Sequence, residues 1–176
     1  MSHSSLPPLN PYATPLQAYA PLPETTLKMP TFCVVMFSIS LILAVLRIPI
    51  VIYGTMNWIR IPPEFMGNPI FLTAPFEILS GAAIVLFGIA GNIGMLRQRR
   101  WGVVLGFLTL NSSLFSLAVA LWQLFIVSRT LNAEQQATFL VGALVTLVIR
   151  GTLIGLFALA VFKMRHYLRL KAAQAA

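Results

Sequence analysis

The sequence is poor in the residues that catalysis and metal binding require. It has no aspartate, four glutamates, two histidines and one cysteine, Cys33. With one cysteine no disulfide can form within the chain, and His3, His166 and Cys33 are widely separated, which argues against a metal site. The chain also has no Ser-His-Asp arrangement, no HExxH, no P-loop and no paired carboxylates. We therefore expect no enzyme, no metal and no bound cofactor.

Charged residues are scarce as well, at 9% of the chain, whereas a soluble domain carries roughly 25%. Apolar residues reach 58% and form four long windows, at about 31–53, 75–96, 101–127 and 139–162. Each window is long enough to cross a bilayer, and in lipid each must satisfy its own backbone hydrogen bonds by forming a helix. The predicted fold class is an all-α membrane protein, with four transmembrane helices packed as a bundle over 31–162.

The net charge of +8 is concentrated in two segments. One lies between the second and third windows and the other follows the fourth; their basic residues are Arg97, Arg99, Arg100, Lys163, Arg165, Arg169 and Lys171. With four spans both segments lie on one side, and the positive-inside rule makes that side cytoplasmic. We interpret these charges as topogenic and in contact with anionic headgroups, not with nucleic acid. The expected location is the plasma (inner) membrane, as a multi-pass protein with both termini in the cytoplasm.

The two ends of the chain outside the apolar windows differ in composition. Residues 1–30 hold seven of the twelve prolines and no sustained apolar run. They predict a disordered, Pro-rich cytoplasmic tail, and they lack the basic start of a signal peptide. Residues 163–176 predict a basic cytoplasmic tail into which the last helix continues.

Arg150 lies near the middle of the fourth window, where a charge costs at least about 3 kcal/mol. We expect it in an intramembrane polar cluster with Asn111, Ser112, Ser116 and Thr146. Three interpretations remain open. Arg150 is a hydrogen-bonding hub between helices, or it pairs with a carboxylate of another membrane subunit. Alternatively, it is a fixed positive charge in a water-filled path for an anionic solute or lipid headgroup.

A second candidate site near the outer surface is an ion pair between Arg47 and Glu77. Both residues lie just inside the membrane, on the first and second windows. The alternative for Glu77 is local. Thr73 and Pro75 are typical of a helix start, and an acid in the first turn is favoured there by the helix dipole.

Glycines mark helix faces that can approach other helices closely. In the second window Gly81, Gly88 and Gly91 fall near one face, and in the fourth Gly151 and Gly155 form a GxxxG pair. Both sets of glycines suit close packing, either within the chain or against another protein.

Two segments resemble small, uncharacterised bacterial four-span membrane proteins. One is Asn10-Pro11-Tyr12-Ala13-Thr14-Pro15, similar to an NPY-type N-terminal opening; the other is the hairpin Gly94-Met-Leu-Arg-Gln-Arg-Arg-Trp-Gly102. The resemblance implies a four-span layout in a bacterial cell membrane and no activity.

The function that these features favour is that of a structural or interaction subunit or scaffold. Its expected partners are the lipid bilayer and either another membrane protein or a second copy of the chain. The alternative is a small oligomeric transporter or channel component that uses Arg150 as a fixed positive site. Since four helices are too few for most solute paths, that alternative requires oligomers.

Overall fold

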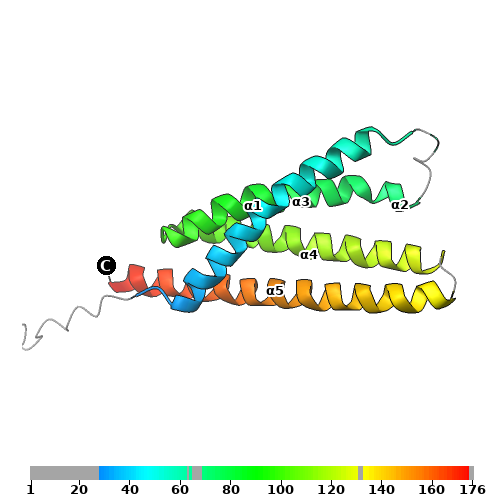
Figure 1. Ribbon diagram of the computed structural model, residues 1–176. Coiled ribbons are helices and arrows are strands. Elements are labelled where there is room, and N and C mark those ends of the chain that lie inside the picture. The colour runs from blue at the N-terminus through cyan, green and yellow to red at the C-terminus, as the bar shows by residue number, and fades with distance from the viewer. Residues whose placement is uncertain (1–27, 63, 65–68, 131–132, 175–176) are drawn as a thin grey trace, which may run out of the picture.

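The computed structural model describes residues 28–62, 64, 69–130 and 133–174, and its ordered elements there are helices. They are α1 (Thr31–Ile59), α2 (Pro69–Leu72), α3 (Ala74–Leu96), α4 (Arg100–Ser128) and α5 (Ala133–Gln174) (Figure 1). The Pro-rich segment 1–27, with its NPY-type opening, lies outside the described residues.

The four long helices coincide with the four apolar windows and are long and apolar enough to cross a membrane. The described chain is all-helical, and its four long helices pack as a bundle. Two helices exceed their windows: α1 continues to Ile59, and α5 runs for 42 residues. At 1.5 Å per residue α5 is about 63 Å long, roughly twice the hydrocarbon thickness of a bilayer.

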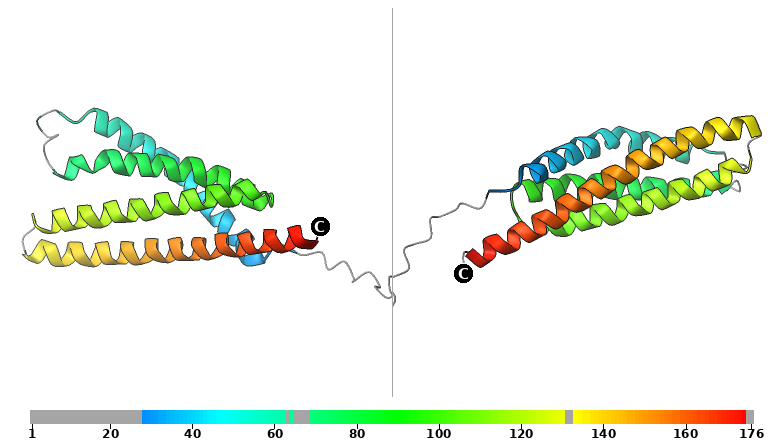
Figure 2. Two further views of the ribbon diagram at one scale, coloured as in Figure 1. Left: turned by 180° about the vertical axis from the view of Figure 1, so that it is seen from behind. Right: turned by 90° about the horizontal axis from the view of Figure 1, so that it is seen from below.

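One end of the bundle gathers the start of α1, the end of α5 and the turn at 97–99 between α3 and α4 (Figures 1 and 2). We call it the hairpin end, and the opposite end, next to Arg60 and Arg129, the far end. The arrangement places the two ends of the described chain together, as an even number of spans requires.

The turn at the hairpin end is a Schellman motif. The Arg99 N–H donates to the Gly94 carbonyl at 2.8 Å, and the Gln98 N–H donates to the Met95 carbonyl at 2.9 Å. Gln98 has a φ of 54°, the left-handed conformation usually occupied by glycine. Its side-chain Oε1 accepts hydrogen bonds from Tyr167 Oη at 3.2 Å and Lys171 Nζ at 2.5 Å. The turn is thereby tied to α5.

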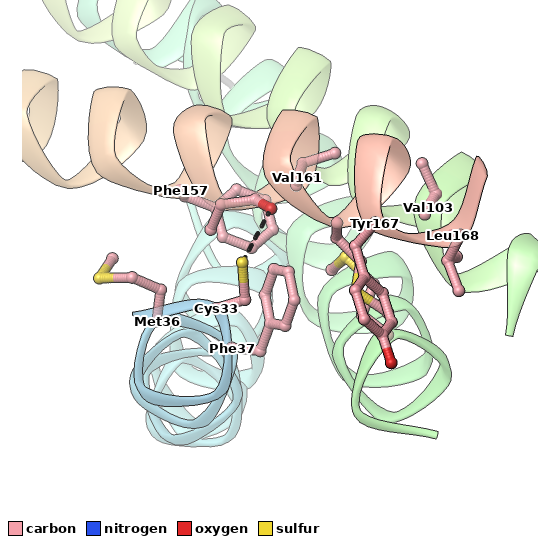
Figure 3. Close-up of a cluster of buried hydrophobic side chains, with 11 residues drawn as sticks. Cys33, Met36, Phe37, Val103, Phe157, Val161, Tyr167 and Leu168 are labelled. Atoms are coloured by element: carbon pink, nitrogen blue, oxygen red, sulfur yellow. Dashed lines mark hydrogen bonds between the residues drawn. The ribbon is translucent and has the colours of Figure 1, made fainter. Parts of the chain in front are cut away.

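The hydrophobic core lies near this hairpin end (Figure 3). The Phe37 ring of α1 meets the Phe157 ring of α5 edge to face, with centroids 6.2 Å apart. The Cys33 thiol, fully buried, donates to the Ala160 carbonyl at 3.6 Å. The core continues along α5 to Leu168, which is 9% exposed. The segment after Phe162 is therefore part of a packed helix as far as Leu168, with its basic residues on the outside.

Toward the far end α1 leaves α5 and lies against α3 (Figure 1). The outer half of α5 consequently packs mainly along α4, and most of its described side chains are exposed. Val141 and Leu144, for example, are 65% and 63% exposed. The divergence of α1 from α5 leaves room for a cavity between them, half-way along the bundle.

Candidate functional site

A cavity of about 170 Å³ lies between α1, α3, α4 and α5. Its polar lining residues are Ser40, Arg47, Thr109, Ser113, Ser116 and Arg150. We call it the arginine cavity. The remaining lining is apolar, and no carboxylate contributes to it.

The Arg47 side chain of α1 contacts both α4 and α3. It is half-buried on α1, and its Nη2 donates to Ser116 Oγ of α4 at 3.3 Å. Its side chain also passes close to Gly81 of α3, where an added Cβ would lie 3.7 Å from Arg47 Nε. The atom closest to that Cβ would be Val51 Cγ2 of α1 at 2.9 Å, so Gly81 lets α1 pack close to α3, while Ser116, only 4% exposed, orients the arginine.

Arg150 is exposed and lines two hollows. It borders the arginine cavity on one side and, on the other, a wider hollow of about 630 Å³ that Glu77, Gln123 and Thr146 also line. Within the described part of the chain no hydrogen bond or salt bridge reaches its guanidinium. Arg150 also repels Arg47, whereas Glu77 attracts Arg47. The site therefore has an excess of positive charge.

Arg47 and Glu77 do not form a salt bridge within 4.0 Å in the described residues. Arg47 binds Ser116 instead, while the half-buried Glu77 sits in the first turn of α3. The local alternative for Glu77 agrees with this position, because the helix dipole favours an acid there. Thr73 occupies the N-cap position, yet its side chain makes no cap bond; its Oγ1 accepts from Gln123 Nε2 at 2.8 Å.

The residues expected around Arg150 are brought together in part. Ser116 shares the arginine cavity with it, and Thr146 shares the wider hollow, donating its own hydroxyl to the Gly142 carbonyl at 2.9 Å. Asn111 is exposed and Ser112 half-buried, and both stand outside the lining of the two hollows. Of the polar residues expected on α4, Ser116, and not Asn111, thus faces the arginines.

One polar contact of the site was not anticipated from the sequence. Asn92 of α3 is fully buried and donates through Nδ2 to Ser40 Oγ of α1 at 3.0 Å. Its Oδ1 has no hydrogen-bond partner among the described residues. A signal was present, since Ser40 precedes Arg47 by seven residues, or two helical turns, and so shares its face.

The basic residues assigned to topology lie at the hairpin end. All seven are exposed there: Arg97, Arg99, Arg100, Lys163, Arg165, Arg169 and Lys171. The Lys163 ammonium lies over the Phe32 ring, 5.2 Å from its centroid. Among the described residues, no three His, Cys, Asp or Glu side chains lie close enough together to hold a metal ion.

Comparison with known proteins finds no match to a family model, to a curated protein or to a solved structure. Two unlike features stand out: the arginine cavity, which offers cationic donors to an acid, and the outer half of α5, which has little cover from the rest of the chain.

Proposed function

We propose that this protein is an interaction subunit of the plasma (inner) membrane of a bacterial cell, which binds a helix of another membrane protein along the outer half of α5. The observation that supports this is the environment of the α5 glycines. An added Cβ at Gly142, Gly151 or Gly155 would meet nothing within 4 Å.

The glycines of α3 and α4 behave in the opposite way. At Gly88 an added Cβ would lie 3.3 Å from Ala44 Cβ of α1, and at Gly91 it would lie 3.1 Å from the backbone of Gly106. The glycines of α3 and α4 therefore stand where helices approach closely. Because a glycine inside a helix costs about 1 kcal/mol relative to alanine, Gly151 and Gly155 suit a helix that comes from outside the chain.

The proposed orientation follows from the charges at the hairpin end. Seven basic residues of the turn and of the last part of α5 lie there, and cytoplasmic loops are enriched in such residues. Both ends of the described chain then face the cytoplasm, and the far end faces outward. The α5 surface offered to a partner lies in the outer leaflet and the centre of the membrane.

The test is purification of the tagged protein from native membranes in a gentle detergent, with size and co-purifying proteins measured together. We expect a stoichiometric second protein that is lost from the double variant Gly151→Leu, Gly155→Leu. The matched control is Val104→Leu on α4, a residue 61% exposed on another helix, which should keep the partner. A chain found alone, or a partner retained by the double glycine variant, would refute the proposal. If the partner were a second copy of the chain, the proposed binding of a different membrane protein would be wrong.

A second candidate function is a component of an anion transporter. It is favoured by Arg150, which borders both the arginine cavity and the wider hollow and could transfer an anion between them. This role would need several copies of the chain, and anion flux in vesicles that is lost in Arg150→Gln separates it from the interaction role.

A further inference from the structure

We propose that the arginine cavity binds the acidic group of an amphiphile, a phosphate or carboxylate attached to an apolar chain, which enters from the lipid between α1 and α5. This inference goes beyond the interaction role and involves a different face of the molecule. It also holds whether or not an anion crosses the membrane.

The first argument is charge. Arg47 and Arg150 bring two guanidinium groups from different helices to one cavity, and they repel each other. Glu77 lies outside the lining of this cavity. A charge within the hydrocarbon region is costly, so two arginines without a bonded acid favour an anion between them. Guanidinium groups bind phosphate and carboxylate oxygens in a bidentate manner, which suits such a ligand.

The second argument is the supply of hydrogen-bond donors. Ser116 accepts from Arg47, and Ser40 accepts from Asn92, so the hydroxyl protons of both serines remain available to a ligand oxygen. Thr109 differs, because its hydroxyl donates to the Leu105 carbonyl of its own helix at 2.9 Å. The donors around the cavity are thus two arginines and two serines, of which Arg47, Ser116 and Ser40 are held by hydrogen bonds between helices.

The third argument is shape. About 170 Å³ is close to the roughly 150 Å³ of a cavity that accepts benzene, so it holds an acidic group and a few carbons. A longer chain must leave the cavity. Three apolar lining residues, Ile39, Leu43 and Leu153, are also 40%, 45% and 37% exposed. They mark an opening toward lipid between α1 and α5, through which an apolar chain can extend.

The apolar opening also decides between two sources of the acid. A free phosphate ion would have to cross apolar surface to reach the arginines, whereas a lipid-like acid would keep its chain in the hydrocarbon. We therefore assign the site to an anion that arrives with an apolar chain.

The experiment is native mass spectrometry of the full chain in detergent containing either phosphatidic acid or phosphatidylcholine, with inorganic phosphate in a parallel titration. We expect retention of phosphatidic acid over phosphatidylcholine. The double variant Arg47→Gln, Arg150→Gln should weaken retention about tenfold or more, since charge-assisted hydrogen bonds are lost. The matched control is Arg129→Gln, whose guanidinium stacks on Phe125 at 4.1 Å outside the cavity; its retention should be unchanged.

Folding is followed in every variant by circular dichroism and gel filtration. If the double variant fails to fold, Arg150→Gln alone is used, because Arg150 bonds to nothing in the described chain and its loss leaves the bundle contacts intact. Arg150→Lys should restore most of the retention. Equal retention of phosphatidic acid by wild type and the arginine variants would overturn the site. Competition by inorganic phosphate at equal concentration would overturn its assignment to an amphiphile.

Discussion

At the scale of single residues, Gln98 shows a conformational cost offset by side-chain contacts. A left-handed residue other than glycine is disfavoured by roughly 1–2 kcal/mol. Gln98 accepts this conformation because the turn between α3 and α4 requires it, and its amide oxygen binds Tyr167 and Lys171 of α5. The same residue therefore ends one helix and anchors another.

Two substitutions at this position separate the backbone contribution from the side-chain contribution. Gln98→Ala and Gln98→Gly both lose the bonds to α5, but only glycine adopts the left-handed conformation without strain. We expect the free energy of unfolding of the alanine variant to be about 1 kcal/mol lower than that of the glycine variant. Denaturant titration in detergent measures the difference. Equal stabilities would show that the turn changes conformation in the variants.

The polar residues of the site show how far sequence reasoning reaches at this scale. Helical rise places Ser116 and Arg150 at similar depth, and the structure puts both on one cavity. Depth does not tell which arginine Ser116 binds, because that depends on which helices are neighbours. The bond from Arg47 follows from α1 lying against α3 close to α4, and no pattern along the chain encodes that order.

At the scale of helices, glycine positions determine how closely α3 and α4 approach. A Cβ added at Gly102 would overlap the Gly94 carbonyl carbon and the Met95 nitrogen, both backbone atoms that cannot move aside alone. The two helices are thus in backbone contact next to their turn. Hydropathy predicts the four helices and their approximate ends, yet it cannot show that the α3 glycines pack inside the chain while those of α5 do not.

Gly102→Ala should force α3 and α4 apart, with a loss in the free energy of unfolding of roughly 2 kcal/mol or more. The control is Gly142→Ala, where the added methyl group meets nothing within 4 Å. That variant should be neutral or gain up to about 1 kcal/mol from helix propensity. Thermal unfolding in the same detergent compares the two. A stable Gly102→Ala protein would contradict the close contact.

At the scale of the whole molecule, packing is uneven along the bundle. The core around Cys33, Phe37 and Met164 lies near the hairpin end, while the outer half of α5 is largely exposed. The sequence could not reveal this gradient, because the fourth apolar window, 139–162, is similarly apolar on both sides of Arg150. The gradient arises from the path of α1, which crosses from α5 to α3.

Cys33 reports on the closed state of this core. It is the only cysteine and has no exposed surface, so a maleimide should modify the native protein very slowly. Gly102→Ala, which disturbs the neighbouring α3–α4 contact, should raise the labelling rate several-fold by opening the core more often. Mass measurement over time follows the reaction. Rapid labelling of the unmodified protein in detergent would show that the core is open.

The position of the core has a consequence for biosynthesis. α1, α3 and α4 leave the ribosome before α5, and α3 and α4 can pair as soon as both are inserted. Cys33 and Phe37, however, find Ala160 and Phe157 only on α5. A chain still lacking α5 would present this apolar surface to the translocon and to membrane chaperones. Synthesis of α5 is thus the step that closes the molecule and ends that exposure.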